Sequence, residues 1–415
     1  MRVQLASKRR CDKRTHRGFI YFSLLVILLS IPFPFPVKAA PPQPSTVTKG
    51  TNAARTNALQ PGITFQALSE RLLGVLLPPN HPLSQPVKQL LEKGDIKGAA
   101  RKLTEDPRFL DIKVRDLAAQ YTNKDENPNV EFDDLQALFI GMTRDGTDAG
   151  ELLTADYRYE KPPAGSRPTR ESNSHYQSID RSETSVSQGL VKTSPQWDGF
   201  LDAAGALTTY SFARAHFFAG TNRLPVKYAL KEFLCRDPEQ WRQLDAPDDW
   251  VRRDVDRLPS GKGDLYQADC RGCHSGMDAL SGAFAYFDFT DKGFIISNRR
   301  KGIVKKYSAN DHVYPEGRAI HSTAWKNYLT QGHNEEIGWV PPLEGQGVKS
   351  LGAMLSRTKA FNECLAERVF RHVCRQKEPS RTITRLLAED FSQGGRKIAQ
   401  LFIDSATHPE CGGQP

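Results

Sequence analysis

One five-residue segment, Cys270-Arg271-Gly272-Cys273-His274, constrains this chain more than any other. Two cysteines three residues apart, followed at once by a histidine, form the attachment pattern of a c-type haem. Each thiol can add to one vinyl group of the porphyrin and leave a thioether bond, and the histidine is then placed to coordinate the iron. The sequence therefore predicts one covalent haem held by Cys270, Cys273 and His274, with His274 as the metal ligand.

Other uses of this motif remain open but fit the sequence less well. A structural zinc site needs four ligands, and no second Cys/His pair at matched spacing is present. A redox-active dithiol is expected beside a strand in a βαβ pattern, which the sequence does not show. A plain structural disulfide is the third alternative. The absence of a second CxxCH segment argues against a multihaem wire or a dihaem peroxidase.

The first 39 residues predict a secretory signal peptide. Residues 1–18 carry seven Lys or Arg against one Asp, an apolar run follows over 19–37, and small residues then lead to Ala39. This arrangement predicts cleavage after Ala39. The alternative is an uncleaved membrane anchor, in which case this segment alone would attach the protein to a membrane. Three prolines in the second half of the apolar run disfavour it, namely Pro32, Pro34 and Pro36.

Removal of the signal peptide on export would take away most of the positive charge of the chain. The formal charge is +9, and residues 1–39, with eight Lys or Arg and one Asp, contribute +7 of it. The mature chain is therefore close to neutral, at about +2, and its charge gives no support for nucleic-acid binding. We expect the protein in the periplasm or cell envelope, with a redox protein as its partner; the sequence leaves the oligomeric state undetermined.

Four cysteines remain once the leader and the haem motif are set aside: Cys235, Cys364, Cys374 and Cys411. In an oxidising compartment they are enough for two disulfides, although four buried free thiols are the alternative. If residues 360–374 form one helix, Cys364 and Cys374 lie about 15 Å apart along its axis. A disulfide needs Cα atoms within about 7 Å, so each would pair with Cys235 or Cys411 instead.

Apolar periodicity predicts a mainly α protein in several parts. After a flexible tether over 40–60, residues 61–160 show helical spacing and form a helical domain. Residues 161–190 are polar and form a linker or long loop, in which we expect His175 to be solvated. A second helical segment covers 191–260. Residues 261–411 form a C-terminal, cytochrome-c-like helical haem domain.

Three helices are predicted to close the chain. The first places Phe361, Leu365, Val369 and Val373 on one face. The second begins after a capping Ser380 and ends at Gly394-Gly395. Its apolar face groups Ile383, Leu386, Leu387 and Phe391, and the third helix groups Ile398, Leu401 and Phe402.

Several of these segments resemble a poorly characterised family of c-type haem proteins. The family was first noticed in planctomycetes and also occurs among exported proteobacterial proteins. The resemblance covers roughly 61–411 and includes Cys270-x-x-Cys-His-x-x-Met277-Asp278-x-Leu280 and Tyr286-Phe287-Asp288. Softer matches are Phe361-x-x-Cys364, Val369-Phe370 to Phe391, Asp133-Asp134-Leu135, Leu153 to Tyr157, and Gly220-Thr221-Asn222-Arg223. Ala279 departs from the proline common there. The resemblance implies haem and export more than any particular reaction.

The ligand on the far side of the iron is left open by the sequence: Met354, His312, His321, His333 or none. A filled position favours simple electron transfer, whereas an open one permits chemistry on a bound molecule. Three functions follow. The favoured one is an exported monohaem cytochrome that passes single electrons to a partner. The alternatives are a haem enzyme with an open distal side and an unknown substrate, or a binding or structural protein with redox-inert haem. Whether the chain is an enzyme stays undecided.

Overall fold

The computed structural model describes residues 63–412, except 128, 163–166, 183, 201, 218–221, 248–265, 298–301 and 305–321. The predicted signal peptide (1–39) and tether (40–60) lie outside the described residues. The residues described belong to one compact unit, Asn57–Pro415. This unit is mainly helical, with only short strands, which confirms the expected mainly α class. The boundaries proposed within it, and the cytochrome-c-like character of its C-terminal part, stay predictions.

The N-terminal part is a series of short helices. Capping side chains mark where several of them begin, and glycines mark where two of them end. Thr64, Asp95 and Asp133 accept hydrogen bonds from the first free N–H groups of α1, α3 and α5, and Gly74 and Gly146 end α1 and α5 in the left-handed region. The elements are α1 (Phe65–Leu73), α2 (Ser84–Glu92), α3 (Ile96–Leu103), the π-helical η1 (Phe109–Val114), α4 (Arg115–Ala119), α5 (Asp134–Asp145) and η2 (Ala149–Leu153).

The predicted linker contains ordered structure. β1 (Arg158–Glu160) pairs antiparallel with β2 (Val191–Thr193), and α6 (Ser174–Asp180) lies between them in the sequence. The expectation that His175 is solvated is wrong: it is 3% exposed, and its Nε2 accepts a hydrogen bond from the Lys161 N–H at 3.3 Å. His175 belongs to α6, a helix that buries only three residues, and the polar residues around it gave no apolar periodicity from which a helix could be predicted. The chain continues through η3 (Gly205–Thr208) and α7 (Tyr210–His216).

The motif-bearing part combines helices with two small antiparallel strand pairs. Phe287 pairs with Ile296 in one, and Ala324 pairs with Gln346 in the other. The elements are α8 (Arg223–Leu234), α9 (Pro238–Trp241), the π-helical η5 (Tyr266–Cys270), α11 (Arg271–Ser281), η6 (Gly282–Phe284), β3 (Phe287–Thr290), β4 (Gly293–Ile296), β5 (Ala324–Lys326), η8 (Gly332–Ile337), β6 (Glu344–Gln346) and α12 (Gly347–Ser356).

The three closing helices were predicted correctly. They are α13 (Lys359–Cys374), α14 (Arg381–Gln393) and α15 (Ile398–Ala406), and Ser380 caps α14 by accepting from the Ile383 N–H. The predicted apolar faces are buried, with one exception. Leu386 is 40% exposed, so its assignment to the buried face of α14 is wrong. The four buried residues of that helix, Ile383, Leu387, Ala388 and Phe391, leave Leu386 at the margin of the apolar stripe.

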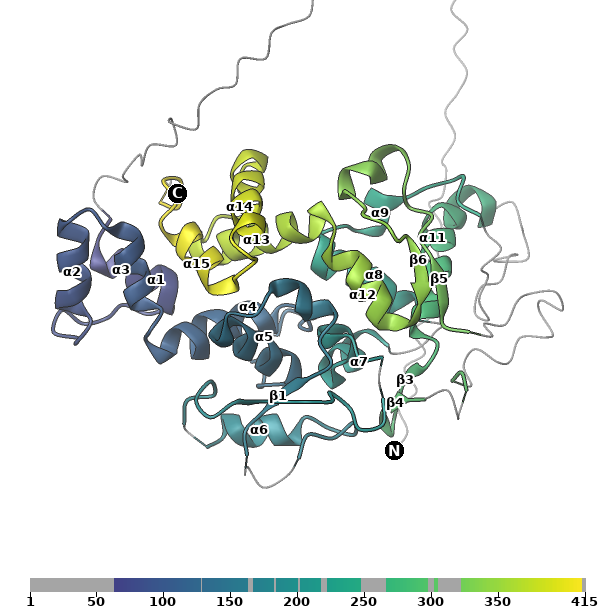
Figure 1. The fold of residues 1–415 in the computed structure, drawn as a ribbon, viewed down its shortest axis with the longest axis horizontal. Coiled ribbons are helices and arrows are strands. Elements are labelled where there is room, and N and C mark those ends of the chain that lie inside the picture. The colour runs from purple at the N-terminus through teal and green to yellow at the C-terminus, as the bar shows by residue number, and fades with distance from the viewer. Residues whose placement is uncertain are drawn as a thin grey trace, which may run out of the picture. The chain divides into compact units, whose positions relative to one another are not determined.

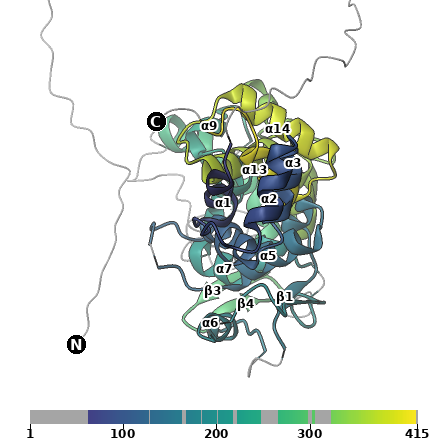
Figure 2. The same cartoon turned by 90° about the vertical axis from the view of Figure 1, so that its left-hand side faces the viewer.

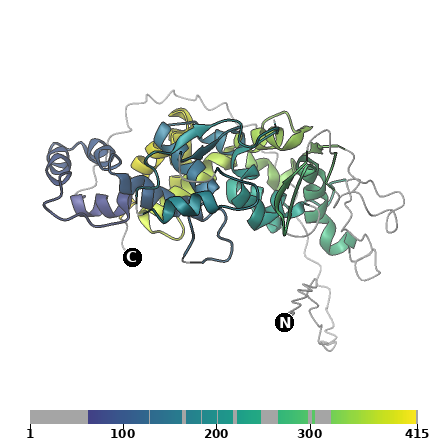
Figure 3. The same ribbon diagram turned by 90° about the horizontal axis from the view of Figure 1, so that it is seen from below.

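Helices from the two ends of the described chain share one core. A continuous cluster of buried side chains extends from Phe65 to Cys411. α13 packs against α1, α4 and α8, and α15 packs against α1 and α3. Figures 1 and 3 show the C-terminal helices (yellow) beside the N-terminal ones (purple to blue), and Figure 2 shows the same group from its side. The helix that carries the CxxCH segment, α11, lies beside α8 and α9.

Candidate haem-attachment site

The CxxCH segment begins α11. Cys270 is the last residue of η5, and Cys273 and His274 lie in the first turn of α11. The spacing i, i+3, i+4 brings the three side chains to one side of the helical segment. All three residues are partly exposed, and neither disulfide of the described chain includes Cys270 or Cys273. Two thiols and one imidazole at this spacing are the donor set that a covalent haem requires, so these residues fit that group.

Glycines allow the neighbouring chain to lie tightly against this helix. A Cβ added to Gly272, between the two cysteines, would lie 2.7 Å from Cγ of Arg242. A Cβ added to Gly276 would lie 2.4 Å from Cδ2 of Leu329. In addition, the Gln243 N–H donates to the Gly272 carbonyl oxygen at 2.9 Å. The first turn of α11 is therefore fixed from outside, which limits how the motif can rotate.

A buried ion pair fixes the same helix one turn further on. Nε of Arg223, at the start of α8, lies 2.6 Å from Oδ1 of Asp278, and their side chains are 12% and 2% exposed. The preceding Asn222 donates from Nδ2 to the carbonyl oxygens of Phe284 (2.8 Å) and Phe287 (3.0 Å). Asp278 follows His274 by four residues. The start of α8 thus positions both α11 and the turn after it.

The thiol of Cys273 is biased towards its protonated form. Burial raises its pKa, and the charge of Glu239 adds to this, while Arg242 and Lys227 act in the opposite direction. Its Sγ donates to the Pro238 carbonyl oxygen at 3.4 Å. Because the thiolate is the form that attacks another sulfur, the raised pKa lowers the reactivity of the Cys273 thiol towards disulfides.

The candidate distal ligands lie in different environments. Met354 on α12 is fully buried, and its Sδ accepts a hydrogen bond from Nδ2 of Asn327 at 3.8 Å. His333 in η8 is exposed. His312 and His321 lie outside the described residues. The structure therefore makes Met354 a core side chain and leaves the choice of distal ligand a prediction.

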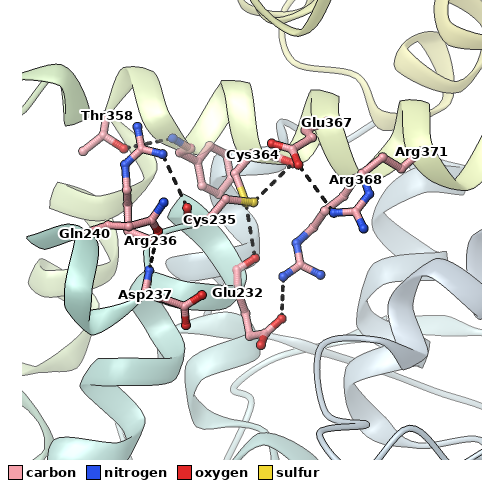
Figure 4. Close-up of a disulfide and its surroundings, with 11 residues drawn as sticks. Glu232, Cys235, Arg236, Asp237, Gln240, Thr358, Cys364, Glu367, Arg368 and Arg371 are labelled. Carbon is pink, nitrogen blue, oxygen red and sulfur yellow. Dashed lines mark hydrogen bonds and ion pairs between the residues drawn. A yellow bond between two sulfur atoms is a disulfide. The ribbon is translucent and has the colours of Figure 1, made fainter. Parts of the chain in front are cut away.

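Two disulfides join elements that are distant in sequence. Cys235–Cys364 links the end of α8 to α13 (Figure 4), and Cys374–Cys411 links the end of α13 to the C-terminal segment. Cys364 and Cys374 both belong to α13, so the expectation that they do not pair with each other is confirmed. Each pairs with Cys235 or Cys411, as the helical spacing required.

An ion pair accompanies the first disulfide. An Nη2 atom of Arg368 on α13 lies 2.5 Å from Oε2 of Glu232 on α8, and the Arg368 guanidinium lies 4.9 Å from the centre of the Tyr121 ring. Burial raises the pKa of Glu232, and the charge of Arg368 offsets part of that rise. α8 is therefore held to α13 at one end and to α11 at the other.

Sequence reasoning identified the three motif residues but not the side chains that fix them. Asn222, Arg223 and Asp278 were noted only as parts of a family resemblance, and nothing in their local spacing showed that they meet. The one available signal was an acidic residue, Asp278, inside an apolar helical stretch, because a buried carboxylate requires a partner.

Within the ranges that the structure describes, no three His, Cys, Asp or Glu side chains are gathered as a metal would require. Across the same ranges, no helix is both long and apolar enough to cross a bilayer. No known protein family, curated protein or solved structure matches this chain.

Proposed function

We propose that the protein is an exported monohaem c-type cytochrome that transfers single electrons to or from a redox protein partner in the periplasm or cell envelope. One observation carries the proposal: Cys270, Cys273 and His274 lie together over the first turn of α11, partly exposed and outside both disulfides. Thiols and imidazole in this order are the donor set of a covalent haem.

Each residue of the site has a defined task in this proposal. Cys270 and Cys273 hold the group through thioether bonds, and His274 provides an imidazole nitrogen to the iron. The haem, when bound, supplies a one-electron iron couple. Arg223 and Asp278 position α11 and so orient His274, since a rigid supporting shell sets the geometry of a metal ligand.

The two disulfides support an exported location. Cys235–Cys364 and Cys374–Cys411 account for all four cysteines of the mature chain outside the motif. Disulfides of this kind persist in oxidising compartments and are rare in the cytosol. Covalent haem attachment to an exported chain and disulfide formation then belong to the same compartment.

A spectroelectrochemical titration of the haem-loaded chain tests the electron-transfer role. We expect a six-coordinate, low-spin iron and one reversible one-electron wave, because a filled coordination shell suits electron transfer. Alanine replacement of each candidate, Met354, His312, His321 and His333, identifies the distal ligand by conversion to a high-spin spectrum. A five-coordinate, high-spin iron in the wild-type chain would favour an enzyme with an open distal side. Absence of any redox wave would favour an inert haem.

A further inference from the structure

The buried ion pair of Arg223 and Asp278 lies one helical turn from the predicted iron ligand. Asp278 follows His274 by four residues within α11, and side chains four residues apart on a helix are neighbours on one face. A helical side chain also leans towards the N-terminal end of its helix, so that of Asp278 leans back towards His274. The carboxylate charge therefore lies close to the imidazole that would hold the iron.

Burial strengthens the effect of this charge on its surroundings. The Asp278 side chain is 2% exposed and that of Arg223 is 12% exposed, with Oδ1 and Nε 2.6 Å apart. The residues beside Asp278 in α11 are apolar and buried: Met277, Ala279 and Leu280. Water and dissolved salt weaken the field of an exposed charge, whereas a charge in an apolar environment acts more strongly on a group one turn away.

Another carboxylate beside the motif differs from Asp278 in this respect. Burial raises the pKa of the Cys273 thiol, and the charge of Glu239 adds to the rise, so Glu239 lies near enough to act on the motif. The Glu239 side chain is exposed to solvent. Glu239 and Asp278 thus provide two carboxylates beside the same motif, one in water and one in the core.

We propose that Asp278 holds the reduction potential of the haem low and that Arg223 limits this effect. The inference rests on the proposed haem at Cys270, Cys273 and His274. A negative charge beside the ligand favours ferric iron, which carries one more positive charge than ferrous iron, and a positive charge favours the ferrous form. Asp278 belongs to the same helix as the ligand and Arg223 reaches it from α8, so the carboxylate dominates.

The sign of the change in potential separates this role from a purely structural one. If the pair only fixed α11 against α8, loss of either charge would loosen the helix and disturb His274 in the same way. Both substitutions would then move the potential in one direction. If the two residues act through their charges, loss of Asp278 and loss of Arg223 must move the potential in opposite directions.

Spectroelectrochemical titration of the haem-loaded full chain tests the inference, with the electrode supplying or removing the single electron of the couple. Asp278→Asn should raise the reduction potential and shift the ferric–ferrous equilibrium about tenfold, which corresponds to about 59 mV for one electron. Arg223→Met should lower the potential by a similar amount. Glu239→Gln, at the exposed carboxylate, is the matched control and should shift the equilibrium less than about twofold.

A double variant keeps the test decisive if a single substitution unfolds the chain, since each removes one charge of a buried ion pair. Arg223→Met/Asp278→Leu replaces the pair with apolar side chains, an exchange that folded proteins often tolerate. Because the carboxylate dominates, this variant should raise the potential, but by less than Asp278→Asn does. The optical spectrum of each variant should match that of the wild type, which shows that the iron keeps its ligands.

Four results would overturn this inference and leave the haem proposal intact. They are shifts of the same sign in Asp278→Asn and Arg223→Met, a double variant with the wild-type potential, a shift in Glu239→Gln as large as that in Asp278→Asn, and a change to a high-spin spectrum on loss of Asp278. A wild-type chain without covalent haem is a different outcome. It would contradict the proposed function itself, and this inference with it.

Discussion

The ion pair of Arg223 and Asp278 shows how two buried residues fix the position of the helix that carries the motif. Asp278 lies inside the apolar stretch of α11, where only a partner makes a carboxylate acceptable. Arg223 meets it from α8 at 2.6 Å. Since charges this deeply buried must be compensated, the pair fixes one relative position of the two helices.

Replacing Asp278 with asparagine should destabilise the fold by about 3 kcal/mol or more, because it removes one charge of a buried ion pair. Glu344→Gln is the control: it breaks the pair of Lys326 and Glu344, whose side chains are 46% and 69% exposed, and should cost about 0–1 kcal/mol. Denaturant unfolding of both variants gives the two values. Equal, small losses would contradict the structural role of the Arg223–Asp278 pair.

A buried histidine makes a second prediction at this scale. His216 is 1% exposed and stacks on Tyr228 with ring centres 4.0 Å apart. Burial lowers its pKa to about 3. An unfolded histidine binds a proton below about pH 6.5, whereas folded His216 stays neutral until about pH 3. Stability should therefore fall as the pH drops from 6.5 towards 3, by about 2–3 kcal/mol per such histidine at pH 4.5.

His216→Phe removes this proton linkage and should flatten the dependence of unfolding free energy on pH between 6.5 and 4.5. The slope, and not the stability at neutral pH, is the quantity compared, since the substitution also removes the contact of Nε2 with the Tyr121 carbonyl oxygen. His372, with a pKa lowered to about 4, preserves part of the slope in every variant.

Among the elements, α8 connects the motif-bearing helix to the C-terminal helices. Its first turn contacts α11 through Arg223, and its last residues are joined to α13 by Glu232–Arg368 and by Cys235–Cys364 (Figure 4). The disulfide spans 129 residues of sequence. Cys374–Cys411 spans only 37. Because loop-closure entropy grows with length, the longer crosslink should stabilise more.

The double variant Cys235→Ala/Cys364→Ala should lose about 5 kcal/mol of stability, and Cys374→Ala/Cys411→Ala about 4 kcal/mol, by the chain-entropy estimate. Double replacement avoids leaving an unpaired thiol that could compete for the haem. Denaturant midpoints of the two variants give the comparison. A loss below about 1 kcal/mol for the α8–α13 crosslink would show that packing alone holds these helices.

For the whole molecule, local sequence signals predicted local structure well. The helical spacing of α13, the Ser380 cap of α14 and the exclusion of a Cys364–Cys374 bond all follow from contacts within a few residues. α6 was not predicted because only three of its residues are buried, His175, Tyr176 and Ile179. Likewise, one stripe of apolar residues could not show that Leu386 lies at its exposed margin.

Contacts between residues far apart in the sequence could not be predicted, because they leave no pattern in the local sequence. The packing of α13 against α1 and α4 joins residues about 240 or more positions apart, and Arg223 meets Asp278 across 55. The candidate site shows the same division. The chemistry of Cys270, Cys273 and His274 follows from five consecutive residues. The groups that position them are distant in the sequence, namely Arg223 of α8, the Arg242 side chain and the backbone N–H of Gln243.

The most direct test of the central claim is a pyridine haemochrome assay on protein purified from a host able to mature c-type cytochromes. The wild-type chain should carry one covalent haem with two thioether bonds, and intact mass should rise accordingly. Cys270→Ala should lose the two-thioether signal, while Cys235→Ala/Cys364→Ala should keep it. A well-expressed, folded wild-type chain without covalent haem would contradict the proposal, and the CxxC pair would then be a disulfide or metal ligand.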